Sequence, residues 1–184
     1  MYLNHDEIMP FLTDGTVVGS DPSLVNTASL DIVLGDTLLV ESNKDDFWNY
    51  RPRVLDYGAR ENFDACKVRM TDEGFVLLPG QFVLGCTVES FNFPNNLAAL
   101  YRSKSTMGRL ALEHMDAGWV DPGFNGVLTL ELKNEFQHHS VRIRPGDRIG
   151  QLIFMRGNAV RQAVSYATTG NYNGAAGVRQ AGFK

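Results

Sequence analysis

Glu131 is the acid best placed for chemistry in this sequence, because it stands alone among aliphatic residues in the run VLTLEL at 127–132. Side chains alternate along a β-strand, so this run predicts a core face of three leucines and an opposite face that carries Thr129 and Glu131. The carboxylate then points to solvent, to a subunit partner or into a pocket. Periodicity by itself favours the solvent-side carboxylate.

A group of cations and hydroxyls precedes this strand in the segment KSTMGR at 104–109. Ser105 and Thr106 can cap a short helix or turn whose first backbone N–H groups remain free. Arg109 follows Ser105 by four residues, so both project from one side of a helix. Hydroxyls, amides and a forked guanidinium suit a polyphosphate, with Lys104 as a second cation. The alternative is an ordinary capped turn with solvated charges.

The segment DPGFNG at 121–126 lies between these two groups. Its proline and two glycines supply turn dihedrals, which predicts either a hairpin or a sharp corner that leads into the strand. This turn begins with an acid, Asp121.

The composition describes one globular domain that must position these groups. The chain has 184 residues, of which 43% are hydrophobic and 21% charged, with a formal net charge of −4. A slightly acidic chain has no basic stripe for a nucleic-acid duplex, so any nucleotide it binds should be small and held in a pocket. No apolar run approaches the roughly 20 residues of a spanning helix, and the N-terminus does not resemble a signal peptide. We therefore expect no membrane partner and a cytoplasmic location.

Short strands separated by turns dominate the pattern. We expect one β domain at 1–166, an all-β sandwich or barrel with a few short helices, followed by a flexible glycine-rich lid at 167–184. The expected elements are a short helix in 4–15, two strands in 27–40, an irregular loop with at most one strand at 41–65, a hairpin of 75–78 with 81–90, a strand at 97–100, and two strands at 140–143 and 148–154 around the turn at 144–147.

The spacing of the cysteines and histidines does not match a metal-binding motif. A zinc deaminase requires His-x-Glu and Pro-Cys-x-x-Cys motifs. His5 and Glu7 match the first by chance, but Cys66 and Cys86 are twenty residues apart and neither follows proline. We expect both cysteines to be buried thiols in strands and no zinc to be bound. The remaining histidines, at 114, 138 and 139, are expected to be structural or on the surface.

Taken together, several blocks resemble the dCTP deaminases of the trimeric dUTPase-like superfamily, including its bifunctional members. The blocks are SLDIVLG at 29–35, LPG at 78–80 with TVES at 87–90, Pro94, KSTMGRL at 104–110, AGWVDPGF at 117–124, TLEL at 129–132 and RIGQL at 148–152. The resemblance covers about residues 27–155. It is specific because the blocks occur in order and the Asp121-to-Glu131 spacing is that of the family.

The resemblance implies a distorted jelly-roll or β-barrel fold that forms homotrimers with active sites shared between subunits. It implies that Glu131 is the catalytic carboxylate, with Ser105 and Arg109 as its partners, and that the Ala117 carbonyl helps to hold the attacking water. Mg²⁺ would be carried by the substrate phosphates, without a direct protein ligand. The implied substrate-binding residues are Lys104, Ser105, Thr106, Arg109, Asp121, Thr129, Leu130, Tyr166, Asn171 and Ala175.

The implied reaction converts dCTP and water to dUTP and ammonia, and so feeds dUMP and dTTP synthesis. It agrees with the chemistry of the residues. A single carboxylate in a dry pocket can take a proton from water and return it to the base, and each well-placed transfer is worth roughly 10²–10⁴-fold. Arg109 beside Glu131 would keep the acid ionised against the desolvation of the pocket.

Three positions depart from the family pattern. Asp116 stands where threonine is usual and brings a carboxylate near the base site, while Asn171 and Ala175 stand where the lid carries a lysine and a glutamine. Loss of a lid cation leaves dCMP or a modified deoxycytidine nucleotide open as the substrate.

Other functions also remain open at this point. The segment 117–121 with Phe124 resembles the bifunctional members, which convert dCTP to dUMP and pyrophosphate. A dUTPase without deaminase activity would not need Glu131. A nucleotide-sensing trimer would need no base at all.

Overall fold

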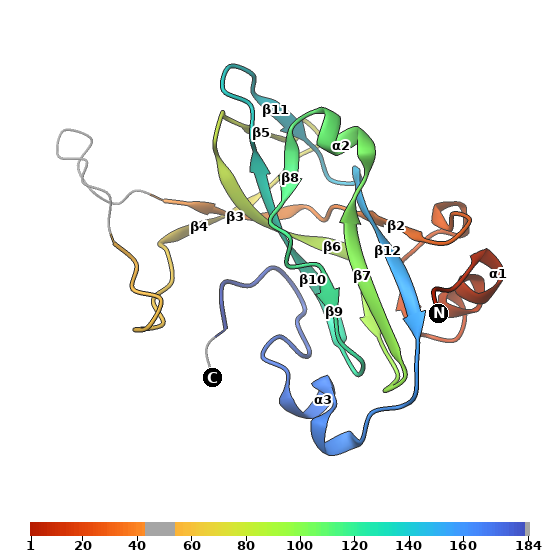
Figure 1. Cartoon of the computed structure of the whole chain (residues 1–184). Coiled ribbons are helices and arrows are strands. Elements are labelled where there is room, and N and C mark those ends of the chain that lie inside the picture. Colours follow the sequence, from red (N-terminus) through yellow and green to blue (C-terminus); the bar gives the residue numbers. More distant parts are fainter. Residues whose placement is uncertain (43–53, 183–184) are drawn as a thin grey trace.

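The computed structural model describes residues 1–42 and 54–182, and the described part is built mainly from β-strands (Figure 1). The mainly β expectation is therefore confirmed. The strands are β1 (Val17–Val18), β2 (Leu30–Val33), β3 (Thr37–Glu41), β4 (Ala65–Arg69), β5 (Phe75–Leu77), β6 (Phe82–Asn92), β7 (Leu97–Ser103), β8 (Leu112–His114), β9 (Trp119–Val120), β10 (Asn125–Asn134), β11 (Val141–Ile143) and β12 (Arg148–Arg156). The helices are α1 (His5–Ile8), α2 (Ser105–Arg109) and α3 (Tyr166–Thr169), with 3₁₀ turns at Met9–Leu12, Pro22–Leu24 and Gln162–Val164.

The strands of the described residues form three antiparallel sheets. The largest has the order β4-β3-β6-β10-β8, with β1 paired to β6 outside this path. A second sheet has the order β2-β12-β7-β9, and β5 with β11 makes a third. The long strands β6 and β10 lie side by side at the centre of the largest sheet, so residues of β10 are supported on both edges (Figure 1).

The hydrophobic core contains side chains from all three sheets. Alternation along β12 places Gly150, Leu152 and Phe154 on the core face, because every second residue of a strand faces the same side. Ile149 is buried as well, next to a shift in the register with β2 between Arg148 and Gly150. On β10, Leu130 and Leu132 are at most 1% exposed. Burial of each such side chain contributes about 1.5–3 kcal/mol to folding, which makes β10 a rigid support for the residues on its other face.

Alternation fails at one predicted core position of β10. Leu128 is half-buried, because the register against β6 shifts between Val127 and Thr129. A β-bulge of this kind re-aims the local side chains. Thr129 and Glu131 remain on the face opposite Leu130.

Strand pairing differs from the sequence expectation in two places. The segments 75–78 and 81–90 do not form a hairpin, since β5 pairs with β11 and β6 pairs with β1, β3 and β10. The turn that follows β5 is instead tied to β10, where Gly80 N–H donates to the Asn134 carbonyl. The two strands in 27–40 are present, but β2 and β3 lie in different sheets because the chain crosses between the sheets at Gly35.

Three local expectations can be compared with the structure. The loop expected at 41–65 leads into a strand, β4, at Ala65–Arg69, and its part at 43–53 lies outside the described residues. The helix in 4–15 is one short α-helix continued by a 3₁₀ turn that begins at Met9 and has Pro10 as its second residue. Both cysteines lie in strands and are free thiols, but only Cys86 is buried, whereas Cys66 is exposed on the edge strand β4. No helix in the described ranges has the length and apolar character needed to cross a membrane.

Candidate active site

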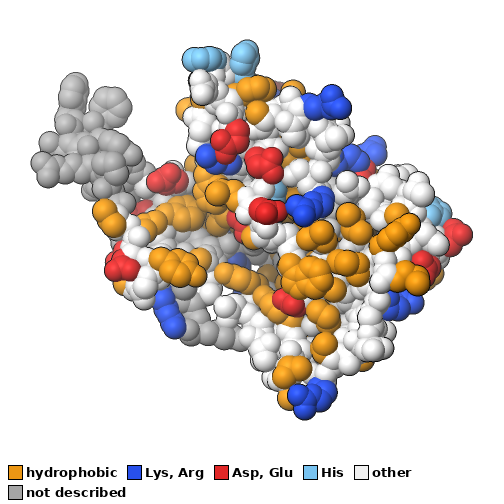
Figure 2. All heavy atoms as spheres, in the orientation of Figure 1, with side chains coloured by type: hydrophobic (Ala, Val, Ile, Leu, Met, Phe, Trp, Pro, Cys, Tyr) orange, Lys and Arg blue, Asp and Glu red, His pale blue; other side chains and the backbone are white. Residues whose placement is uncertain are grey.

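A cavity of about 690 Å³ opens on the face of the large sheet opposite the core. Its walls come from β6, β10, the corner between β9 and β10, the segment 55–63 and the C-terminal segment 166–181. Figure 2 shows hydrophobic side chains gathered around the hollow on this side of the molecule. A cavity of this size, mostly apolar with a few polar groups, is typical of a small-molecule site.

Glu131 lines this cavity, so its carboxylate points into a pocket and not into open solvent. Its side chain is 30% exposed, and burial raises its pKa to about 7. Its Oε2 lies 3.2 Å from Nε2 of His114, but the two groups are not aligned for a hydrogen bond, and Oε2 has no hydrogen-bond partner. At neutral pH this acid can both accept and return a proton, which is the requirement for a general base that later acts as an acid.

Asp121 lies at the corner that leads into β10. The chain turns sharply there and does not form a hairpin, because β9 pairs with β7 while β10 pairs with β6 and β8. Trp119 Nε1–H donates to Asp121 Oδ1 at 2.9 Å and fixes this carboxylate at the rim of the cavity. Gly123 has a φ of 85°, and a Cβ there would lie 2.0 Å from Ser165 Oγ, so the corner requires glycine.

Of three further predicted residues, two lie on this wall and the third has its side chain in the core. Ala117 and Thr129 line the cavity. Thr129 Oγ1 accepts a 3.2 Å hydrogen bond from the Arg179 backbone N–H. Leu130 has its side chain in the core at 1% exposure, so any contact it makes with a ligand in this cavity would come from its backbone.

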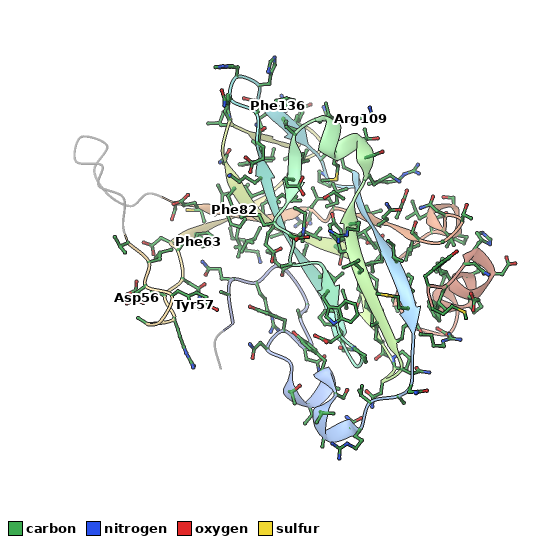
Figure 3. All side chains as sticks on the ribbon, in the orientation of Figure 1. Asp56, Tyr57, Phe63, Phe82, Arg109 and Phe136 are labelled. Carbon is green, nitrogen blue, oxygen red and sulfur yellow. The ribbon has the colours of Figure 1, made fainter. Side chains whose placement is uncertain are left out.

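The predicted phosphate residues do not line the cavity of their own chain. Helix α2 begins at Ser105 with Lys104 as N-cap, and neither hydroxyl makes a side-chain cap bond, contrary to the capping prediction. Ser105, Thr106 and Arg109 are exposed. Figure 3 shows Arg109 on α2, well away from Tyr57, Phe63 and Phe82 at the cavity.

Lys104 is engaged elsewhere. Its ammonium group lies 2.5 Å from Asp31 Oδ2, and the Asp31 side chain is 2% exposed. Arg148 Nη1 lies 3.7 Å from the same oxygen. A buried carboxylate needs nearby positive charge, so Lys104 compensates for the burial of Asp31 on β2.

The sequence suggested that the Asp116 carboxylate lies near the bound nucleobase, but in the structure it points away from the cavity. Asp116 has a φ of 49°, its side chain is 89% exposed, and Oδ1 accepts from Arg102 Nη1 at 3.1 Å. It does not line the cavity, although its neighbour Ala117 does. The left-handed backbone at this non-glycine residue makes a tight turn between β8 and Ala117.

The C-terminal segment crosses the cavity and rests on β10. Val127 N–H donates to the Ala175 carbonyl at 2.9 Å, and Ala175 is 4% exposed against Gly126. Asn171 Nδ2 donates to the Gly182 carbonyl. Of the predicted residues in this segment, Tyr166 lines the cavity, whereas Asn171 and Ala175 do not.

Sequence reasoning missed several groups at the cavity. Arg179 is the one lysine or arginine among the described residues that line it. Tyr172 and Gln180 come from the same segment, and Tyr57 and Phe63 come from the segment expected to be an irregular loop. His114 was expected to be structural or on the surface, and it is a buried residue that contacts the candidate base. None of these residues belongs to a local motif, so spacing could not have found them.

The described residues contain no group of three or more His, Cys, Asp and Glu side chains that could hold a metal ion.

Comparison with known proteins gives consistent matches. The family model described as dCTP deaminase-like matches residues 3–157. Proteins named "dCTP deaminase, dUMP-forming" from Mycobacterium tuberculosis (strain H37Rv) and Acidothermus cellulolyticus are each 38% identical over 161 residues, covering 85% of this chain and 80% of theirs. The corresponding protein from Kocuria rhizophila is 36% identical over 160 residues, with the same coverage.

A solved structure supports the fold. The 2'-deoxycytidine 5'-triphosphate deaminase from Agrobacterium tumefaciens superposes with a TM-score of 0.66 at 24% identity. The match covers 87% of this chain and 49% of that one, so this chain spans about half its length. The family model and the curated relatives together show that the chain belongs to the dCTP deaminase-like family.

Proposed function

We propose that this protein deaminates dCTP and converts the product to dUMP and pyrophosphate. The observation that carries the proposal is the position of Glu131, a half-buried acid whose pKa is raised to about 7, in a cavity with Ala117 and Asp121 on the same wall. The names of the curated relatives support dUMP as the final product. The sequence alone favoured dUTP as the product, with dUMP as the alternative, and the relatives reverse this order.

The deamination assigns two proton relays to Glu131. In the first, the ionised carboxylate takes a proton from a water molecule whose oxygen adds to C4 of cytosine, and the protonated acid delivers this proton to ring N3. In the second, the carboxylate takes the proton of the new C4 hydroxyl and passes it to the amino group, so that the C4–N bond breaks, ammonia leaves and the C4 carbonyl forms. Water and dCTP thus become dUTP and ammonia, with Ala117 supplying the carbonyl that accepts a hydrogen bond from the water.

A second copy of the chain would complete the site. Ser105, Thr106 and Arg109 are exposed and lie outside their own chain's cavity. We propose that α2 of a neighbouring subunit brings these groups to the cavity, in a homotrimer with shared sites. Arg109 would then favour the ionised form of Glu131, against the burial that raises its pKa.

The phosphates would be neutralised by the lid as well as by α2. Arg179 supplies a cation at the cavity, in a segment where Asn171 stands in place of the family's lysine. A magnesium ion that entered with the phosphates would neutralise part of their charge, while the chemistry at C4 would fall to protein groups. We therefore propose the triphosphate as substrate.

The test is incubation of the purified protein with magnesium and, separately, with dCTP, dCMP and dUTP. Products are resolved by anion-exchange chromatography and ammonia is assayed. We expect dUMP, pyrophosphate and ammonia from dCTP. The Glu131→Gln variant should lose deamination by roughly 10²–10⁴-fold. The matched control is Glu135→Gln, because Glu135 follows β10 and pairs only with Lys133 on the surface.

Each other outcome rejects a distinct part of the proposal. Accumulation of dUTP would mean that the protein is a deaminase without pyrophosphate release. Turnover of dUTP alone, unchanged in Glu131→Gln, would mean a dUTPase. Faster turnover of dCMP would remove the triphosphate preference, and no turnover of any nucleotide would favour a nucleotide-sensing trimer.

A further inference from the structure

His114 lies directly against the candidate base. It is the last residue of β8 and pairs with Leu132 of β10, next to Glu131 in the strand. The residue is 6% exposed, and Nε2 approaches Glu131 Oε2 to 3.2 Å. A small rotation of either side chain would convert this contact to a hydrogen bond. Such bonds are often long in ligand-free enzymes and tighten when substrate binds.

The imidazole is held in this position by its surroundings. The Tyr101 ring lies 4.4 Å from it between centroids, at an interplanar angle of 42°. Tyr101 is fixed in turn, because its hydroxyl donates to the Ile149 carbonyl at 3.1 Å. The backbone is also tied to the base strand, since Met115 N–H donates to the Glu131 carbonyl. His114 therefore has little freedom to leave Glu131.

Burial sets the charge of the pair. It lowers the pKa of His114 to about 4 and raises the pKa of Glu131 to about 7, so the imidazole is neutral at physiological pH. A neutral imidazole has one N–H and can donate it to either the ionised or the protonated acid. The other charged or titratable groups around the pair are Tyr101 and Arg102 on β7, Glu113 on β8, Asp116 in the turn, and Asp121, Glu61 and Arg179 at the cavity.

We propose that His114 is a positioning residue for Glu131, donating Nε2–H to Oε2 so that Oε1 faces the water and the base throughout the reaction. This inference rests on the proposed deamination. His114 remains the neutral Nε2–H tautomer in every step and exchanges no proton. The proton from water moves to Oε1 and then to the cytosine ring. Oε2 accepts a hydrogen bond from His114 Nε2–H before and after this transfer. The orphaned Oε2 thereby gains its partner.

The kinetic test compares His114→Phe and His114→Asn with the wild type, with dCTP, from pH 5.5 to 9. Phe keeps the stack on Tyr101 but has no donor, and we expect kcat to fall roughly 100-fold while KM changes less than threefold. The acid limb of the kcat profile should move up by about one pH unit, because the ionised carboxylate loses a hydrogen-bond donor. Asn can restore a donor and should recover part of both effects.

A merely structural histidine would behave differently. His114→Phe would then lower thermal stability or raise KM and leave the acid limb in place, and that result overturns the proposal. The proposal is also overturned if His114→Asn shows the same kcat and the same acid limb of the pH profile as His114→Phe, while both variants melt at the wild-type temperature.

A second measurement does not depend on turnover. In ¹⁵N-histidine NMR spectra, His114 should remain the neutral Nε2–H tautomer from pH 6 to 8, and its Nε2 signal should shift as Glu131 titrates. This shift should vanish in Glu131→Gln. If the wild type fails to deaminate dCTP but shows the shift, the proposed function fails and the pairing stands. A His114 signal that titrates near 6.5, or ignores Glu131, rejects the pairing itself.

Discussion

Gln180 of the C-terminal segment and Phe63 of the segment 55–63 are joined across the mouth of the cavity. The Gln180 side-chain amide donates to the Phe63 carbonyl at 2.6 Å. Asn62 Nδ2 donates in the other direction, to the Ala181 carbonyl, at 3.0 Å. The Phe63 ring packs edge-on against Phe82 of β6 at 6.1 Å. Two segments that are far apart in the sequence are thus joined at the wall of the cavity.

Removal of this junction should weaken substrate binding. In the double variant Asn62→Ala/Gln180→Ala, we expect KM for dCTP to rise roughly tenfold, because two hydrogen bonds of about 0.5–1.5 kcal/mol no longer hold the segments closed. Steady-state kinetics measure this effect. The control is Gln137→Ala, at an exposed position outside the cavity lining. An unchanged KM in the double variant would show that closure does not depend on these bonds.

Shared sites can be tested by mixing two inactive variants. Arg109→Ala lacks the proposed guanidinium from α2, and Glu131→Gln lacks the base, so each should be inactive alone. After unfolding and refolding together in equal amounts, random trimers should recover about one quarter of the wild-type activity per site, since an intact site needs one unaltered residue from each of two neighbours. Recovery is measured as ammonia release. No recovery in mixed trimers would place both residues in the site of one chain.

Arg179 should matter most for nucleotides with several phosphates. Arg179→Met removes the cation from the cavity wall, and a charge-assisted hydrogen bond to phosphate is worth enough that we expect KM for dCTP to rise about tenfold. Binding of dCMP should change less. The control is Arg161→Met, because Arg161 is exposed before a 3₁₀ turn and lies outside the cavity lining. Equal losses for dCMP and dCTP would contradict a contact with the outer phosphates.

Glu89 should make stability depend on pH. It is 0% exposed, its Oε1 has no hydrogen-bond partner among the described residues, and burial raises its pKa from its ordinary value of 4.5 to about 7. The folded state therefore binds more protons than the unfolded state between about pH 4.5 and 7, and this contribution to stability is complete below that window and lost as pH rises through it. The loss amounts to at most about 3 kcal/mol.

The variant Glu89→Gln should reduce this dependence. Its melting temperature, measured by calorimetry, should fall less between pH 5 and pH 8 than that of the wild type. Gln can still accept the 3.1 Å hydrogen bond from Val33 N–H, which keeps the comparison local. Glu131 has a pKa raised in the same direction and would account for the part of the dependence that remains in the variant. Identical pH profiles would show that Glu89 is not protonated in the folded protein.

The sequence alone determined the elements whose information is local. Alternation identified β10 and separated Leu130 and Leu132 from Glu131, because the two faces of a strand are set by a period of two residues. Proline and glycine located the corner at Asp121–Gly126 through the dihedrals they favour. The ordered blocks identified the family, which the family model and curated relatives then showed.

Tertiary structure decided which strands and side chains became neighbours. A strand pattern does not specify its partner, so β5 was assigned to β6 when it pairs with β11. His114 reaches Glu131 only through the pairing of β8 with β10, and Arg179 reaches Thr129 only because the C-terminal segment lies along β10. These contacts join residues that are distant in sequence. Their free energy comes from packing the whole sheet, which no local spacing records.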